Sequence, residues 1–263
     1  MNLGGRTALV TGASGGLGQA IARALARRGA DLVLTARRTE LIEGLADEIR
    51  GRAISCDLAD RSALERLIDE AGPIDALVAN AGLPASGRIH TFSVEEIDRA
   101  IDVNLRAPML LARLMSEGMA ERGGGHIVFV SSLSGKAGAA GSSVYSATKF
   151  GLRGFAQGLR EDLRPRGVGV STIFPAFIRE AGMFHESGAR LPGYIGTKKP
   201  EDVANAVVSA IERDRSEIDV APIPLRIGTM LSGLAPEAVA IVQRKLGASE
   251  LASQFESGQR EKR

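Results

Sequence analysis

The chain has 263 residues with a formal net charge of +2, and 44% of them are hydrophobic, which is enough for one large α/β core. One cysteine, Cys56, excludes an intrachain disulfide, and scattered arginines argue against a nucleic-acid partner. No apolar run approaches the ~20 residues of a membrane span. A first strand near Arg6 leaves no room for a signal peptide, so we expect a cytoplasmic protein.

Predicted strands and helices alternate along the chain. Strands are expected at about 6–11, 31–36, 52–56, 74–79, 126–131, 168–174 and 217–220. Helices are expected at about 19–28, 39–50, 61–71, 94–122, 143–164 and 200–213. This alternation predicts a parallel sheet with helices on both faces. We expect one domain over 1–263, with a long irregular loop at about 175–199, an apolar extension at about 221–250 and a frayed polar tail at 251–263.

A glycine-rich turn follows the first predicted strand directly. Its spacing is Gly12-x3-Gly16-x-Gly18, and a predicted helix comes next. This arrangement can hold a pyrophosphate, because glycines allow close backbone approach and a helix N-terminus offers free N–H groups. An ordinary strand-to-helix loop has the same pattern, so the turn alone leaves both interpretations open.

Tyr145 and Lys149 are four residues apart in a predicted helix, which puts both side chains on one face about one turn apart. A phenol has a reference pKa of ~10, and a nearby ammonium favours the phenolate and lowers that pKa. The pair could therefore form a general acid/base that works near neutral pH.

Further polar motifs follow the predicted strand ends in a fixed order. They are Asp57-Leu58, Asn80-Ala81-Gly82, Asn104, Ser132, Tyr145 and Lys149. Together with the glycine turn, this series closely resembles the short-chain dehydrogenase/reductase family, in its subfamily with TGxxxGxG and YxxxK motifs. The resemblance covers residues 6 to about 220 and implies a Rossmann-like, doubly wound parallel sheet of seven strands in the order 3-2-1-4-5-6-7.

The resemblance implies a catalytic role for four residues. Tyr145 would exchange a proton with the substrate oxygen, and Ser132 would hold that oxygen; the family's usual separation favours Ser132 over its neighbour Ser131. Lys149 would lower the pKa of Tyr145 and bind the nicotinamide ribose. Asn104 would anchor a water in a proton relay to Lys149, unless it bonds only to nearby backbone.

The end of the second predicted strand bears on the choice of cofactor. An acidic residue there would favour NAD, but Ala36, Arg37 and Arg38 occupy the position, and arginine suits a 2′-phosphate. We expect NADP(H) to be preferred and NAD(H) to be possible, although two solvated arginines would give the same pattern. The expected cofactor-binding residues are Gly12, Ser14, Gly16, Leu17, Gly18, Arg37, Arg38, Asp57, Leu58, Asn80, Ala81, Gly82, Tyr145, Lys149, Pro175, Phe177 and Ile178.

The loop at 175–199 is expected to enclose the substrate, because it follows the sixth strand at the ligand-binding edge of such sheets. It departs from the family where Ala176 replaces a glycine and no threonine is present near Arg179 and Glu180. Its apolar side chains predict a lipophilic ketone, aldehyde or alcohol as substrate, and residues 225–234 could also help to close the pocket. The apolar loop residues are Phe177, Ile178, Met183, Phe184, Leu191 and Tyr194. The expected substrate-binding residues are Ser132, Tyr145, Met183 and Phe184.

Gly151, Gly154 and Gly158 share one face of the predicted helix at 143–164. A mid-helix glycine costs ~0.5–1 kcal/mol relative to alanine, so three of them suggest a close helix–helix approach. The family commonly pairs this helix between subunits, which implies a homodimer or homotetramer; packing within the chain is the alternative.

Two functions remain open from the sequence. The first is an NADP(H)-dependent oxidoreductase, and the second is a non-catalytic nucleotide-binding regulator or membrane-peripheral scaffold on the same fold. Such regulators usually lose the tyrosine or the lysine, and here both are present, which favours the enzyme. No metal is expected, because His90, His126 and His185 stand apart from any metal-ligand spacing.

Overall fold

The computed structural model describes residues 1–193, 195–245 and 248–259. Tyr194, residues 246–247 of the predicted apolar extension and residues 260–263 of the predicted tail lie outside the described residues. None of the described helices is both long enough and apolar enough to cross a membrane.

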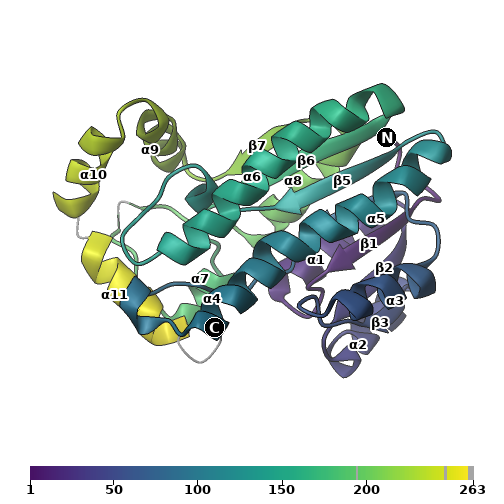
Figure 1. The fold of residues 1–263 in the computed structure, drawn as a ribbon, viewed down its shortest axis with the longest axis horizontal. Helices are drawn as coiled ribbons and strands as arrows, with labels where there is room; N and C mark the ends of the chain where they lie inside the picture. The colour runs from purple at the N-terminus through teal and green to yellow at the C-terminus, as the bar shows by residue number, and fades with distance from the viewer. Residues whose placement is uncertain (194, 246–247, 260–263) are drawn as a thin grey trace.

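Seven parallel strands form one sheet in the order β3-β2-β1-β4-β5-β6-β7 (Figure 1), which confirms the predicted fold class and strand order. The strands are β1 Thr7–Thr11, β2 Asp31–Ala36, β3 Arg52–Ser55, β4 Ala76–Ala79, β5 Gly125–Val130, β6 Val168–Pro175 and β7 Glu217–Val220. β1 pairs with β2 on one side and β4 on the other, so the strand order reverses there. Ligands of such sheets bind beyond the carboxyl ends of the strands at this point.

Helices cover both faces of the sheet, and the strands supply apolar side chains to both. Ala8 and Val10 of β1 join the core on one face, while Leu9 joins the core on the other, as the two-residue period of a strand requires. The first face carries α1 Gly16–Ala26, α2 Glu43–Ile49 and α8 Pro200–Arg213. The second face carries α3 Arg61–Ala71, α5 Ala107–Glu121 and α6 Ser143–Leu163.

Two predicted helices are interrupted. The helix predicted at 94–122 consists of α4 Val94–Ile101, a π-helical segment Asp102–Arg106 and α5. π-Helical turns are rare and occur often at functional sites, and this one carries Asn104. The helix predicted at 39–50 begins as a 3₁₀ turn and continues as α2. The 3₁₀ turns are Thr39–Leu41, Ile89–Thr91, Leu133–Gly135 and Arg164–Arg166.

The C-terminal part is more ordered than predicted. The loop after β6 contains α7 Gly182–Ser187, and the apolar extension forms α9 Ile223–Leu234 and α10 Pro236–Lys245. The prediction of a frayed tail is wrong for residues up to 259, because α11 Ala248–Gln259 packs against α7 (Figure 1). Its composition is polar, but Phe255 anchors it on Phe177 and Phe184.

Candidate active site

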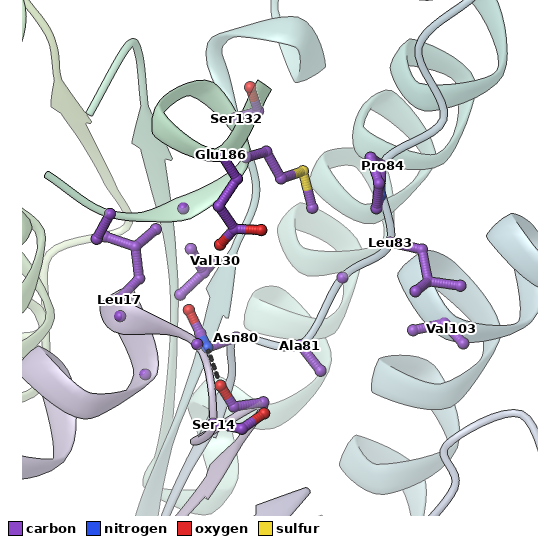
Figure 2. A pocket seen from close by; sticks show the side chains of 18 of the residues that line it. Ser14, Leu17, Asn80, Ala81, Leu83, Pro84, Val103, Val130, Ser132 and Glu186 are labelled. Atoms are coloured by element: carbon purple, nitrogen blue, oxygen red, sulfur yellow. Dashed lines mark hydrogen bonds between the residues drawn. The ribbon is translucent and has the colours of Figure 1, made fainter. Parts of the chain in front are cut away.

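A cavity of about 600 Å³ opens at the carboxyl end of the sheet (Figure 2). The β1–α1 turn, the ends of β2 to β6, the start of α6 and the loop around α7 all contribute to its lining. Most of the residues predicted from the motifs therefore meet in one space. The predicted residues that line it are Gly12, Ser14, Gly16, Leu17, Gly18, Arg37, Arg38, Asp57, Leu58, Asn80, Ala81, Gly82, Ser132, Tyr145, Lys149, Pro175, Ile178, Met183 and Phe184.

The glycine turn forms a cradle that larger residues would fill. Gly12 has a φ of +66°, and a Cβ there would lie 2.7 Å from the Cα of Ala81. A Cβ on Gly16 would lie 2.6 Å from the Cβ of Ala181. Gly15 is the N-cap of α1 and makes no side-chain capping hydrogen bond. The backbone N–H groups in the first turn of α1 are therefore not capped by this residue. An anionic pyrophosphate fits this cradle.

Hydrogen bonds of Thr11 and Asn80 link the ends of two neighbouring strands beside the cavity. The Asn80 Nδ2 donates to the Thr11 carbonyl oxygen at 3.0 Å, and the Thr11 Oγ1 accepts from the backbone N–H groups of Asn80 and Ala81 at 3.1 and 3.0 Å. Figure 2 shows Asn80 beside the turn that carries Ser14. These bonds join the ends of β1 and β4 at the point where the strand order reverses.

The far end of the cavity carries the predicted basic residues. Arg37 and Arg38 are exposed and line the cavity at the end of β2. Asp57 accepts a hydrogen bond from the Ala59 N–H at 3.0 Å and lies 3.6 Å from the Arg99 guanidinium. Arg99 also lines the cavity. No sequence motif marks it, because it belongs to α4 and is distant along the sequence from the strand ends that carry the motifs.

Lys149 is buried at the inner end of the cavity, with 2% of its surface exposed. Its Nζ donates to the Val130 carbonyl oxygen at 3.0 Å and lies 5.6 Å from the centre of the Tyr145 ring. Burial lowers the pKa of the Lys149 ammonium to about 8, because a charged group loses its hydration there. The lysine is therefore charged in neutral solution and neutral in moderately alkaline solution.

Tyr145 is half-buried and differs from the sequence expectation in its acidity. Burial raises the pKa of its phenol to about 12, against a smaller lowering by a hydrogen bond with Ser132. The expected lowering by Lys149 is not seen: the lysine Nζ donates to the Val130 carbonyl oxygen, and burial and Ser132 account for the shift of the tyrosine pKa. Tyr145 therefore keeps its proton near neutral pH and can act as a proton donor.

The two serines after β5 have different partners. The Ser131 hydroxyl is buried and donates to the Lys149 carbonyl oxygen at 3.2 Å, which holds α6 against β5. Ser132 Oγ accepts from the Ser134 N–H at 3.2 Å and lies beside the phenol of Tyr145. Of the two hydroxyls, that of Ser132 is the one next to the tyrosine.

Asn104 lies outside the lining and is almost fully buried, with 1% exposed. Its Oδ1 accepts from the Leu83 N–H at 2.6 Å, and its Nδ2 donates to the Leu83 carbonyl oxygen at 3.0 Å. A Cβ on Gly82 would lie 3.3 Å from the Asn104 Oδ1 and 3.6 Å from the Lys149 Nζ. Asn104 therefore shapes the segment at Gly82, immediately beside the lysine.

The segment after β6 brings the apolar side chains of Ile178, Met183 and Phe184 to the cavity lining. Phe177, predicted to bind the cofactor, is not in the lining; its ring packs against Phe184 at 5.3 Å between centroids. The suggested closure by 225–234 is also not observed, since no residue of α9 lines this space among the described residues. A residue of α11, Gln259, lines it instead.

Several lining residues carried no motif signal. Gly15, Thr35, Ala36, Val130 and Ala176 neighbour predicted residues and could have been found from the strand ends. Arg99, Val103, Glu186 and Gln259 come from helices whose approach to the cavity depends on tertiary packing. The lining residues outside the predicted set are Gly15, Thr35, Ala36, Cys56, Leu83, Pro84, Arg99, Val103, Val130, Ser131, Ala176, Ala181, Gly182, Glu186 and Gln259.

Comparison with known proteins gives consistent matches. The family model for short chain dehydrogenases matches residues 6–191. Ketoacyl reductase HetN of Nostoc sp. is 39% identical over 232 residues, covering 85% of this chain and 81% of that protein. A short-chain dehydrogenase from Sphingobium yanoikuyae in complex with NADPH is 30% identical, with a TM-score of 0.76 and coverage of 88% and 96% of the two chains. The 3-ketoacyl-(acyl-carrier-protein) reductase from Brucella melitensis complexed with NADH is 25% identical, with a TM-score of 0.75 and coverage of 83% and 97%.

The chain therefore belongs to the short-chain dehydrogenase family, as the motifs indicated. It is an oxidoreductase that acts on CH–OH or carbonyl groups. The glycine cradle at one end of its cavity and the Tyr145–Lys149 pair at the other fit a nicotinamide dinucleotide.

Proposed function

We propose that the protein interconverts a lipophilic alcohol and its ketone or aldehyde with NADP(H), using Tyr145 as the general acid/base. One observation carries this proposal. Tyr145, Ser132 and Lys149 meet at one end of a cavity whose other end is a glycine cradle at a helix N-terminus. A cofactor held in that cradle would extend toward the tyrosine.

In the reductive direction a nicotinamide cofactor held by the glycine cradle and Lys149 would supply a hydride for the carbonyl carbon. The protein must then supply a proton to the oxygen, and the neutral phenol of Tyr145, with its pKa raised to about 12, can do so. The Ser132 hydroxyl would hold the carbonyl oxygen beside that phenol. Lys149, while charged, would stabilise the phenolate that remains and bind the ribose hydroxyls. Asn104 would keep the segment at Gly82 in place beside Lys149.

The preference for NADP(H) rests on Arg37 and Arg38. Both are exposed in the lining at the end of β2, where a planar guanidinium can donate two hydrogen bonds to a 2′-phosphate. One structural neighbour holds NADPH and another holds NADH, so use of NAD(H) stays compatible with the fold.

The lipophilic substrate is supported by apolar side chains in the cavity lining, which include Met183, Phe184, Leu83 and Val103. Met183 is the one placed near Lys149, because a Cβ on Gly82 would lie 3.5 Å from the Met183 Cε and 3.6 Å from the Lys149 Nζ. The names of HetN and of the Brucella enzyme both describe reductases of ketoacyl chains, which combine a carbonyl with an apolar tail. We therefore place 3-oxoacyl compounds first among the candidates.

A substrate series tests the proposal. Consumption of NADPH is measured with 3-oxoesters of rising chain length, and with a small charged sugar-like carbonyl compound as the contrast. We expect kcat/KM to rise with the length of the apolar chain. A best substrate that is small and charged would contradict the apolar pocket, and tight NADPH binding without any turnover would favour a regulatory nucleotide-binding protein.

A further inference from the structure

Helix α9 carries a stripe of large apolar side chains that faces solvent. The stripe follows the i, i+4, i+7, i+8 and i+11 spacing of one helix face and consists of Ile223, Ile227, Met230, Leu231 and Leu234. The exposed fractions of Ile223, Met230 and Leu234 are 69%, 71% and 83%. Single exposed apolar residues are common on soluble proteins, but a continuous stripe of them marks a surface that something else covers.

The opposite side of α9 makes the contrast stronger. None of the residues of α9 is buried, and its half-buried positions are Leu225, Gly228, Thr229 and Ser232. Most of these inward-facing residues are small, and two carry a hydroxyl group. A surface helix of a soluble domain turns its large apolar residues toward the core. α9 turns them outward, so its sequence is fitted to an apolar environment outside the protein.

The charges of this region favour an anionic partner. Arg226 is the only charged residue of α9, and it is exposed beside the stripe, about one turn from stripe residues on either side of it. The sequence of α10 adds two basic residues, Arg244 and Lys245, and one acidic residue, Glu237. Basic residues therefore outnumber acidic ones by three to one over the two helices.

The length of α9 limits how it can meet a membrane. Its 12 residues make a helix of about 18 Å, whereas the hydrocarbon core of a bilayer is about 30 Å thick. The main neighbour of α9 is α10, and α10 in turn contacts α11, so the three helices form one group at an edge of the molecule (Figure 1). A helix with an apolar stripe and basic residues beside it is the pattern that binds parallel to a membrane surface.

We propose that the α9 stripe binds the surface of a membrane that contains anionic lipids. The helix lies parallel to this surface, with the stripe among the acyl chains and the Arg226 guanidinium at the level of the lipid phosphates. A second copy of the chain would also cover the stripe, but a symmetric contact would bring the basic residues of both copies together. The excess of positive charge therefore favours the lipid surface. The inference goes beyond the proposed function and does not depend on it.

The test measures binding of the full chain to lipid vesicles by sedimentation. Two compositions are used, phosphatidylcholine alone and phosphatidylcholine mixed with the anionic lipid phosphatidylglycerol. The variants are Leu234→Glu in the stripe and Arg226→Gln beside it. Val94→Glu is the matched control, because Val94 is an apolar residue of α4 with a similar exposed fraction of 68%. Light scattering in lipid-free buffer and the affinity for NADPH report the size and the folding of each protein.

We expect the wild type to bind the mixed vesicles more tightly than the neutral ones. Leu234→Glu should lower the binding constant by about 10- to 100-fold on both, because an apolar side chain that enters the acyl chains becomes charged. Arg226→Gln should lower it by about 5-fold on the mixed vesicles and leave it unchanged on the neutral ones. Val94→Glu should match the wild type on both.

A wild type that binds neither vesicle would overturn the inference, and so would an equal loss of binding in Val94→Glu. If the wild type does not bind vesicles and Leu234→Glu has a lower mass than the wild type in lipid-free buffer, then a second copy of the chain covers the stripe instead. None of these measurements uses turnover, so a failure here leaves the proposed function intact.

Discussion

The two ends of the sheet both bury ionisable groups, and they use them differently. At the carboxyl end Lys149 and Tyr145 border the cavity of about 600 Å³, with pKa values shifted by burial to about 8 and about 12. At the amino end burial lowers the pKa of His126 to about 4, beside a smaller cavity of about 340 Å³. The Ser171 Oγ donates to the Arg215 carbonyl oxygen at 2.6 Å and so accepts from the His126 Nε2 at 2.8 Å.

The comparison shows that a shifted pKa does not by itself mark a catalytic group. His126 is neutral near neutral pH, and its one N–H is already engaged by Ser171. Tyr145 keeps a transferable proton next to a cavity with a nucleotide cradle. What distinguishes the functional end is a proton that a ligand can reach.

The largest expected effect is at the carboxyl end. Tyr145→Phe should reduce turnover by about 10²–10⁴-fold, because the substrate oxygen loses its proton donor. NADPH affinity should stay near the wild-type value, since the hydroxyl acts on the substrate. Steady-state kinetics and NADPH fluorescence titration measure the two quantities. Wild-type turnover in a folded Tyr145→Phe variant would show that the tyrosine hydroxyl is not needed. The carboxyl end of the sheet would then not differ from the amino end by a catalytic proton donor.

At the amino end the corresponding change should alter stability instead. The folded pKa of His126, about 4, lies below its ordinary value of 6.5, so the unfolded chain binds more protons between these values. The contribution of His126 to the free energy of unfolding should therefore be present in full above pH 6.5. The free energy of unfolding should fall by up to about 3 kcal/mol as the pH drops toward 4.

His126→Gln keeps a donor for Ser171 and removes the titration, so its stability should depend less on pH in this window. Urea unfolding at several pH values measures the slope, and His90→Gln, at an exposed position, is the control. If both variants retain the wild-type dependence of unfolding free energy on pH, then burial does not lower the pKa of His126.

A smaller effect is expected at the far end of the cofactor cradle. Arg37→Ala should weaken NADPH binding by about 10- to 100-fold and leave NADH binding nearly unchanged, because a charged hydrogen bond contributes about 1.5–3 kcal/mol. Titration with both cofactors tests this, with the exposed Arg27→Ala as control. Equal losses for NADPH and NADH would show that Arg37 does not distinguish the 2′-phosphate.

The smallest effect on turnover is expected for a substitution at an exposed glycine of α6, the helix that joins the two ends of the sheet. Gly154 and Gly158 are exposed, and a Cβ added at either would meet no described atom within 4 Å, whereas a Cβ on Gly151 would lie 3.1 Å from Leu105. We predict a homodimer or homotetramer that buries the two open glycines. Light scattering should give a lower mass for Gly158→Glu and no change for Gly44→Glu, an exposed helix glycine elsewhere. A monomeric wild type would contradict the prediction.

The sheet and the cofactor half of the site could be predicted because their signals are local. Apolar runs mark the strands, and Gly12, Asn80 and Tyr145 follow strand ends in a recognisable order. The rest depends on contacts between distant segments. Gln259 meets Met183 across 76 positions of sequence, and no spacing encodes that contact. The acidity of Tyr145 was predicted in the wrong direction, because it depends on burial and on the partner that Lys149 adopts.

The most direct test of the central claim is a transfer experiment with NADPH that carries deuterium at the transferable position of its nicotinamide ring. The protein is mixed with this cofactor and a long-chain 3-oxoester, and the product alcohol is analysed by mass spectrometry. The account predicts one deuterium on the carbinol carbon with wild type, and a rate lowered by about 10²–10⁴-fold with Tyr145→Phe. Labelled cofactor that binds without transfer, or transfer at an equal rate in both proteins, would contradict it.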